Sequence, residues 1–232
     1  MAPRFALYFA PRPETALARF GAGVIGHDIW SGEAVPHADL AIDAEHVRTA
    51  TEEPRRYGFH ATLKAPFHLR EGTTEAALER HVAAFAATLA HVSLGQLEVR
   101  ALSRFLALVP ADPPHSLAEL AAACVQAFEA FRAPLTDADR ARRLAAPLTE
   151  RQRALLDTWG YPYVLDEFRF HMTLTGALDG SLRPAFERAL VERWAAVEEP
   201  AVIEGLALAV QPTRDAQFRV KAYFPFMPAS AT

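Results

Sequence analysis

Apolar residues at every second position predict strands at several points along the chain. In the segment 4–11, Phe5, Leu7 and Phe9 occupy alternate positions, which gives one apolar face with the two-residue period of a strand. A strand-like pattern of apolar residues also predicts strands over six further segments, at residues 56–67, 97–102, 104–110, 168–175, 201–211 and 218–225. The chain therefore contains seven predicted strands spread over its whole length.

Apolar residues at three- and four-residue intervals predict helices between these strands. Leu78, Val82, Phe85 and Leu89 have this spacing in the segment 74–92, which begins with threonine, a residue type that caps helices. Helices are also expected over 14–23, 116–132 and 182–197, with shorter helical pieces over 137–158. The segment 26–54 contains Gly, Pro, His and acidic residues without clear periodicity, so we expect it to be mostly loop.

The order of elements begins again halfway along the chain. The segment 104–110 (Arg-Phe-Leu-Ala-Leu-Val-Pro) resembles 4–11 (Arg-Phe-Ala-Leu-Tyr-Phe-Ala-Pro). Two successive units of strand-helix-strand-helix-strand are the simplest description. No flexible linker separates them, so residues 1–226 are expected to form one bilobed domain. The lobe-level repeat covers roughly 4–102 and 104–225, and residues 227–232 are expected to be a disordered tail.

A second repeat carries the candidate chemistry. Tyr57-Gly-Phe-His-Ala-Thr-Leu63 aligns with Phe168-Arg-Phe-His-Met-Thr-Leu174, so the pattern aromatic-x-Phe-His-x-Thr-Leu occurs twice. A single His-x-Thr triplet would carry little weight and would fit a core histidine beside a β-favouring threonine. Two copies with matching residues on both sides favour a shared functional role.

Strand alternation predicts which side chains of each copy lie together. In the first copy His60 and Thr62 share a face with two cations, Arg56 and Lys64. In the second copy His171 and Thr173 share a face with Arg169. Each strand thus has an apolar face for the core and a polar face carrying a cation, an imidazole and a hydroxyl. Two such faces, related by an approximate internal two-fold axis, would enclose a cleft.

These groups suit the chemistry of a phosphate ester. Because imidazole titrates near neutrality, one histidine can accept a proton from the attacking oxygen while the other donates one to the leaving oxygen. Threonine hydroxyls can donate hydrogen bonds to the non-bridging phosphate oxygens, and arginine or lysine can hold a further phosphate. Such a site needs no metal and no cofactor. A zinc site made by both histidines and a carboxylate is a less favoured alternative, because neither motif contains a second ligand at close spacing; the carboxylates considered are Asp166, Glu167 and Asp215.

The paired His-x-Thr strands resemble the two-histidine (2H) phosphoesterase superfamily, which has the LigT-like fold. The segments 54–67 and 159–176 resemble the hallmark blocks of one branch, the phosphonate-metabolism proteins of phosphonate-utilisation operons. The resemblance implies an α+β fold, a bilobed pseudo-two-fold repeat in which each lobe is an antiparallel sheet with helices on the outside, around a central cleft. It also implies that the catalytic residues are His60, Thr62, His171 and Thr173. By analogy His171 is the base and His60 the acid.

The superfamily acts mostly on 2′,3′-cyclic phosphates and related cyclic phosphodiesters. The resemblance therefore implies a phosphoric diester hydrolase, a metal-independent cyclic phosphodiesterase. Membership of this branch suggests a small cyclic phosphate as substrate, such as 5-phosphoribosyl 1,2-cyclic phosphate in phosphonate metabolism. Two alternatives remain open: an RNA-end 2′,3′-cyclic phosphodiesterase or ligase, and a catalytically silent nucleotide-binding module.

Cations and tyrosines near the motifs are the candidate substrate-binding residues. Arg56, Lys64 and Arg169 rank first because they share the motif faces, whereas Tyr8 and Tyr161 offer stacking or hydrogen bonds. The last strand has a polar face that fits the cleft and a solvated surface equally well, with Gln217, Arg219, Lys221 and Tyr223. A charged helical stretch is expected to lie on the surface, with a lid role as the alternative; it contains Arg140, Arg142 and Arg143.

Composition and charge narrow the range of partners. The formal net charge of −4 disfavours a protein that coats nucleic acid, so phosphate must be bound by local clusters and the expected partner is a small phosphorylated substrate. Nucleic acid is not excluded, and the sequence carries no signal for an oligomeric state. The single cysteine, Cys124, lies in an apolar helical run and is expected to be a buried, inert thiol.

The same features predict where the protein acts. One cysteine excludes an intramolecular disulfide, which suits the cytoplasm. No apolar stretch approaches the ~20 residues that cross a bilayer, and the N-terminal segment lacks the features of a signal peptide. The chain is therefore expected to be cytoplasmic, without a membrane partner.

Overall fold

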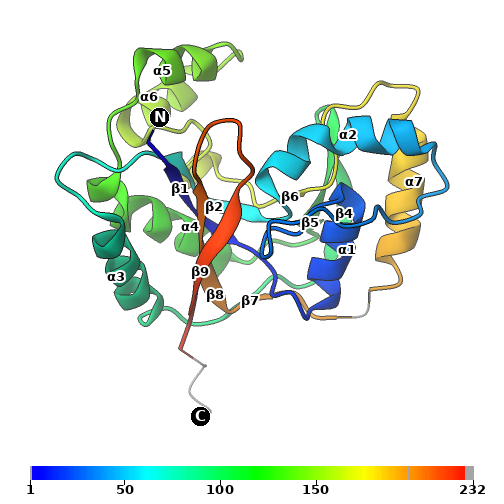
Figure 1. The fold of residues 1–232 in the computed structure, drawn as a ribbon, viewed down its shortest axis with the longest axis horizontal. Coiled ribbons are helices and arrows are strands. Elements are labelled where there is room, and N and C mark those ends of the chain that lie inside the picture. Colours follow the sequence, from blue (N-terminus) through cyan, green and yellow to red (C-terminus); the bar gives the residue numbers. More distant parts are fainter. Residues whose placement is uncertain (1, 198, 228–232) are drawn as a thin grey trace.

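The strands form antiparallel sheets in an α+β fold (Figure 1). The structure is a computed structural model, and it describes residues 2–197 and 199–227. The larger sheet has the order β2-β1-β8-β9, made of Ala61–Phe67, Arg4–Phe9, Gly205–Gln211 and Arg219–Pro225. The smaller sheet has the order β4-β5-β6, made of Leu97–Leu102, Phe105–Pro110 and Met172–Thr173. A two-stranded ribbon pairs β3 (Val92–Ser93) with β7 (Val202–Ile203).

Seven α-helices surround these sheets in the described part of the chain. They are α1 (Ala16–Ile25), α2 (Ala44–Tyr57), α3 (Glu75–Ala86), α4 (His115–Ala127), α5 (Asp137–Leu144), α6 (Glu150–Trp159) and α7 (Arg183–Trp194). The larger sheet is covered by α3, which packs on β8 and β9, and by α4, which packs on β2; α7 packs on β4 of the smaller sheet. In Figure 1 the larger sheet and α3 lie to the left, and the smaller sheet, α1 and α7 lie to the right. The helices predicted over 14–23, 74–92, 116–132, 137–158 and 182–197 are confirmed, with ends that differ by a few residues.

Each sheet combines strands that are distant in the sequence. The larger sheet joins β1 and β2 to β8 and β9, whereas β4 forms a hairpin with β5 in the smaller sheet. This arrangement differs from the predicted division into 4–102 and 104–225, which would have kept each sheet within one half. The physical reason lies in β8: all seven of its residues are buried, so it needs a place inside a sheet, beside β1.

The two motif strands pair with their neighbours in the same way. Thr62 of β2 lies opposite Tyr8 of β1, and Thr173 of β6 lies opposite Ala107 of β5. By this pairing Tyr8 corresponds to Ala107. The sequence alignment of 104–110 on 4–11 instead matches Tyr8 with Leu108, so the structural correspondence is shifted by one residue.

The two faces of the larger sheet differ in the size of their side chains. Phe5, Leu7 and Phe9 belong to the main core, together with Leu78 and Val82 of α3. On the opposite face Tyr8 packs among four alanines, Ala6, Ala10, Ala207 and Ala209, together with the larger Ile29 and Phe218. Small side chains of the sheet therefore form much of the surroundings of Tyr8.

The segment 26–54, predicted to be mostly loop, contains most of α2. The helix begins after Asp43, whose carboxylate accepts hydrogen bonds from the N–H groups of Glu45 and His46. It continues to Tyr57 and ends at Gly58, so the strand predicted over 56–67 begins only at Ala61. Arg56 therefore lies on a helix and not on the strand that follows His60.

The structure also bears on the predictions for the strand 168–175, the C-terminal tail and Cys124. The strand predicted over 168–175 is reduced to Met172–Thr173, although Phe170, Met172 and Leu174 are buried as alternation predicts. The tail 227–232 lies outside the described residues except for Met227, whose N–H donates to the carbonyl of Leu89. Cys124 is buried as predicted, and burial raises the pKa of its thiol to about 12.

None of the described helices has the length and apolar character needed to span a membrane.

Candidate active site

The first motif places His60 in the turn between α2 and β2. Gly58 takes a φ of +74° there, and a Cβ atom at this position would lie 2.5 Å from Cβ of Ile29. The Nδ1 of His60 donates to the carbonyl of Gly58 at 2.9 Å, and its Nε2 lies 3.1 Å from Oγ1 of Thr62. The imidazole stacks on the ring of Tyr8, with 3.7 Å between ring centroids. Backbone and ring contacts together fix the orientation of His60.

The second motif repeats the backbone contact of the first. The Nδ1 of His171 donates to the carbonyl of Arg169, again two residues earlier, at 2.8 Å. The ring of His171 lies beside Phe105, with 5.8 Å between centroids. Because a carbonyl can only accept, both histidines carry a proton on Nδ1 and leave Nε2 for other partners.

A cavity of about 370 Å³ is lined by both motifs, and we call it the histidine cavity. Tyr8 and Thr62 line it from the larger sheet, His60 from the turn before β2, and Phe105 and Thr173 from the smaller sheet. His171 does not line this cavity. Its ring lies behind Phe105, which does line it. Its charge nevertheless acts on His60, so the two imidazoles interact through space.

The environment of His60 sets its charge. The pKa of His60 is lowered to about 4, mainly because the ring is buried; the hydrogen bond to Gly58 opposes this shift, and the charge of His171 adds a smaller part to it. His60 is therefore neutral at pH 7, with the lone pair of Nε2 available as a proton acceptor. Burial also raises the pKa of Tyr8 well above its usual range, so Tyr8 remains a neutral phenol. Its buried hydroxyl has no hydrogen-bond partner among the described residues.

Lys64 lies on a different face from the one that alternation predicts. The pairing of β1 with β2 shifts register between Leu7 and Tyr8, so Lys64 pairs with Leu7 while Thr62 pairs with Tyr8. The ammonium donates to the carbonyl of Val125 at 2.8 Å and pairs with Glu129 at 3.2 Å. This β-bulge directs the charge of Lys64 toward α4, away from His60.

Lys221 is displaced in the same way. The register shifts between Leu208 and Ala209 where β8 pairs with β9, which turns Lys221 toward α3. There it forms ion pairs with Glu75 and Glu79, and it lines neither the histidine cavity nor its neighbour. The structure does not bring Lys221 to the candidate site.

The remaining predicted binding residues divide into two groups. Tyr8 and Tyr161 line the histidine cavity, and Arg56, in the last turn of α2, lines the adjacent one. Arg169 is exposed and lines neither cavity, because the chain around it is extended and turns its side chain outward from buried Phe170.

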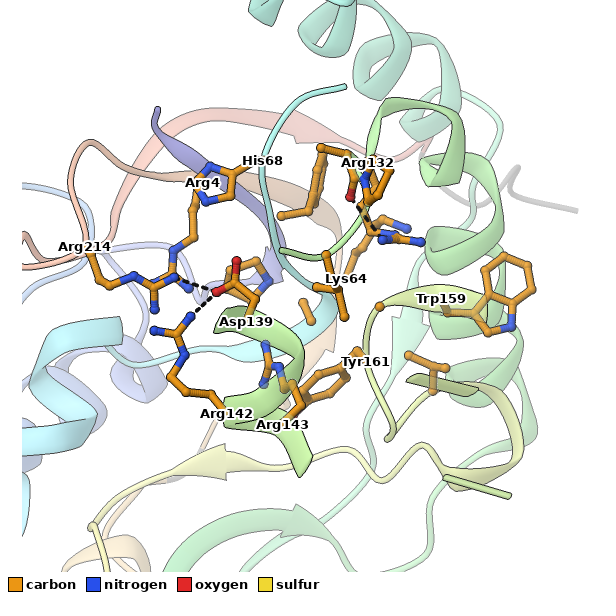
Figure 2. A pocket seen from close by; sticks show the side chains of 18 of the residues that line it. Arg4, Lys64, His68, Arg132, Asp139, Arg142, Arg143, Trp159, Tyr161 and Arg214 are labelled. Carbon is orange, nitrogen blue, oxygen red and sulfur yellow. Dashed lines mark hydrogen bonds and ion pairs between the residues drawn. The ribbon is translucent and has the colours of Figure 1, made fainter. Parts of the chain in front are cut away.

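The adjacent cavity, of about 420 Å³, is lined by several cations that sequence analysis did not assign to substrate binding (Figure 2). We call it the basic cavity. Arg142 and Arg143 belong to the helical stretch that was expected to lie on the surface, with a lid role as the alternative. Nothing in the sequence pattern indicated Arg4 or Arg214 as a binding residue. Arg4 begins β1 and Arg214 lies in the turn between β8 and β9, so only the pairing of these strands brings them together.

The carboxylates considered as zinc partners of the histidines lie elsewhere. Asp166 pairs with Arg151 at 2.6 Å, Glu167 accepts from Gln152 at 3.0 Å, and Asp215 lines the basic cavity. Residues 2–197 and 199–227 contain no group of three or more His, Cys, Asp or Glu side chains arranged to hold a metal ion.

Comparison with known proteins yields one family and two curated relatives. The family described as "Protein of unknown function (DUF1045)" matches residues 62–219, which include Thr62, His171 and Thr173. A relative from Janthinobacterium sp. (strain Marseille) is 39% identical over 231 residues, 96% of this chain and 51% of the relative. A relative from Laribacter hongkongensis (strain HLHK9) is 38% identical over 227 residues, 94% of this chain and 50% of the relative.

Both relatives bear the name "Ribose 1,5-bisphosphate phosphokinase PhnN". This chain spans about half the length of the curated relatives it matches. The family match covers more than half of the chain and includes three of the four motif residues. The chain therefore belongs to the family described as "Protein of unknown function (DUF1045)".

Proposed function

We propose that this chain is a metal-independent cyclic phosphodiesterase of the 2H type that hydrolyses a small cyclic phosphate. The observation that supports this most is the matched orientation of the two histidines. Each Nδ1 is held by the carbonyl two residues earlier, which leaves both Nε2 atoms for proton transfer. Thr62 and Thr173 line the same cavity and supply hydroxyl donors for a phosphate.

The lowered pKa of His60 supports a particular assignment of the two roles. With a pKa of about 4, neutral His60 accepts the proton of the attacking water at Nε2. The water oxygen bonds to phosphorus as one ester P–O bond breaks, and His171 in its protonated form gives its proton to the leaving oxygen. This assignment reverses the one suggested by analogy. In the free protein the hydroxyl of Thr62 lies against Nε2 of His60, and on binding it would turn to a non-bridging phosphate oxygen.

The relatives' name supports a particular substrate. In 5-phosphoribosyl 1,2-cyclic phosphate, breaking the bond between phosphorus and the oxygen on C2 leaves ribose 1,5-bisphosphate. That compound is the one in the name of both relatives. We infer that this chain corresponds to the half of such a protein that supplies ribose 1,5-bisphosphate, in phosphonate metabolism. The size of the histidine cavity suits a ligand of this class.

A phosphotransferase is the second candidate, because the relatives are named as phosphokinases. A P-loop would require the pattern G-x-x-x-x-G-K-[ST] at the start of a helix. The chain contains Gly21 and Gly26 at that spacing, but His27 follows in place of lysine. Gly21 also lies inside α1, where a Cβ would overlap the ring of Phe59, so this run packs the core. We therefore propose that the named phosphokinase activity belongs to the half of the relatives that this chain does not match.

Turnover of a substrate panel tests the proposal. Purified chain is given 5-phosphoribosyl 1,2-cyclic phosphate, 2′,3′-cyclic AMP, an oligonucleotide ending in a 2′,3′-cyclic phosphate, and ribose 1,5-bisphosphate with ATP, and products are followed by phosphorus NMR. We expect the highest kcat/KM for the phosphorylated sugar ring, and a loss of about 10² or more in kcat in His60→Ala and in His171→Ala.

Other outcomes would overturn the proposal in distinct ways. A preference of tenfold or more for the oligonucleotide would indicate an RNA-end enzyme. ATP-dependent phosphorylation that survives both substitutions would indicate a kinase. Binding of nucleotides without turnover of any ester would indicate a silent nucleotide-binding module.

A further inference from the structure

The basic cavity adjoins the histidine cavity along a shared wall. Both cavities are lined by Arg4, Tyr57, Ala65, Pro66, Arg143 and Tyr161. Seven arginine and lysine side chains line the basic cavity, against two aspartates, Asp139 and Asp215. Such a concentration of positive charge in a chain with a net charge of −4 points to an anionic ligand.

Some of these charges are already neutralised. Lys64 and Arg132 both pair with Glu129, at 3.2 Å and 2.5 Å. Arg142 and Arg214 share a single carboxylate, that of Asp139 (Figure 2). One negative charge thus serves two cationic side chains at each of these places.

Arg4 and Arg143 have no carboxylate partner among the described residues. Arg4 donates to the neutral amide oxygen of Gln211 at 2.8 Å, and Arg143 lies over the ring of Tyr161, 4.6 Å from its centroid. Burial lowers the pKa of Arg4, which shows that its surroundings do not fully compensate the charge. Since both arginines line both cavities, their uncompensated charge lies at the junction.

Asp139 occupies the place where a bound anion would sit. Its carboxylate receives Arg214 at 2.6 Å and also pairs with Arg142. It belongs to α5, a helix without any buried residue, so charged and aromatic contacts attach this helix to the body. An incoming phosphate would compete with Asp139 for these arginines.

We propose that the basic cavity binds a second phosphate group of the substrate, remote from the ester that is cleaved. The substrate is then a small molecule with two phosphate groups: one at the histidines and one held by Arg4, Arg143 and Arg214. The sequence pattern instead favoured Arg56, Lys64 and Arg169. Of these, Arg56 and Lys64 line the same cavity, although Lys64 is paired with Glu129, and Arg169 lies outside it. The inference rests on the proposed function for the identity of the reacting ester, but the phosphate site itself can be tested without turnover.

Calorimetric titration with ribose 5-phosphate tests this site, with ribose as the control ligand. We expect wild type to bind ribose 5-phosphate and not ribose. Arg143→Ala and Arg214→Ala should each raise Kd by tenfold or more. The exposed Arg169→Ala and the active-site variant His60→Ala should change Kd by less than twofold. A thermal melt of each variant checks that it is folded.

Removal of the competing carboxylate gives an effect in the opposite direction. Asp139→Asn should lower Kd by threefold or more, a gain that misfolding cannot produce. Its matched control is Asp179→Asn, which removes an exposed carboxylate 3.8 Å from Arg104, outside both cavities, and should leave Kd unchanged.

Three results would overturn the site: a Kd within twofold of wild type in both arginine variants, a tenfold loss in His60→Ala, or weaker binding in Asp139→Asn. Failure of the proposed reaction gives a different pattern. If every cyclic ester proves inert while the arginine and aspartate effects are observed, the reaction fails and the phosphate site stands.

Discussion

The contacts of a few single residues define the proposed chemistry. His60 is held by a backbone carbonyl, a threonine hydroxyl and the face of Tyr8, and burial keeps it neutral. The sequence motif predicted both histidines and both threonines as the catalytic residues. It could not indicate the charge of either imidazole, because that charge depends on Tyr8 and on burial, which the fold creates from distant segments.

The low pKa of His60 predicts the acid side of the pH profile. If His60 is the base, kcat/KM should fall as the pH drops below its pKa, because protonated His60 cannot accept a proton. The acid limb, which reports the free enzyme, should therefore lie near pH 4, well below the usual 6.5 of histidine. The profile is measured on the best cyclic substrate between about pH 3.5 and 9. This interval covers both the expected limb near pH 4 and the usual titration range of histidine. An acid limb between pH 6 and 7, the usual histidine range of about 6.5, would contradict the assignment of His60 as base.

Gly58 positions His60 and leaves no room for a side chain. Its φ is +74°, and an added Cβ would approach Ile29 at 2.5 Å. Gly58→Ala should therefore lower the free energy of unfolding by about 2–4 kcal/mol, from left-handed strain together with the steric clash. Gly72→Ala is the matched control, since Gly72 has a φ of +81° with no atom within 4 Å of the added Cβ. Urea denaturation of both variants gives the comparison, and equal losses would show that the Ile29 contact has no role.

At the scale of secondary-structure elements, regular alternation is informative until a strand bulges. It grouped His60 with Thr62, whose side chains lie 3.1 Å apart. It also put Lys64 on the face of His60 and allowed Lys221 a place in the cleft, but neither lysine lines the histidine cavity. A bulge shifts every later side chain to the other face, and neither bulge has a marker in the sequence. The helix α2 was missed for another reason: its few buried positions lie among charged residues, and Pro54 occupies its last turn.

The bulge in β9 predicts that Lys221 has no part in substrate binding. Its ammonium pairs with Glu75 and Glu79 on α3, away from both cavities. Lys221→Ala should leave KM and kcat within about twofold of wild type, since exposed ion pairs contribute little. Steady-state kinetics on the cyclic substrate checks this. A tenfold rise in KM would place Lys221 back in the binding site.

At the scale of the whole molecule, the site depends on which strands become neighbours. The sequence predicted most strands and helices and the α+β class, because periodicity is a local property. Sheet order is not local: β8 and β9 join β1, which brings Arg214 to Arg4 and forms the basic cavity. Arg4, Arg143 and Arg214 come from three separate segments, so no spacing rule could have found them.

Activity should persist without metal ions. The proposed mechanism uses imidazoles and hydroxyls only, so dialysis against EDTA should leave kcat/KM unchanged. The measurement compares dialysed and untreated enzyme on the same cyclic phosphodiester. Loss of activity on chelation, with recovery on addition of zinc or manganese, would replace this mechanism with one in which a metal activates the water.

The most direct test of the two-histidine mechanism is a double-substitution cycle on kcat for a cyclic phosphodiester. The four proteins are wild type, His60→Ala, His171→Ala and the variant with both substitutions. If the histidines act as one proton-transfer pair, each single substitution costs about 10² or more, and the double variant is scarcely slower than the slower single variant. Near wild-type turnover in either single variant would contradict the account.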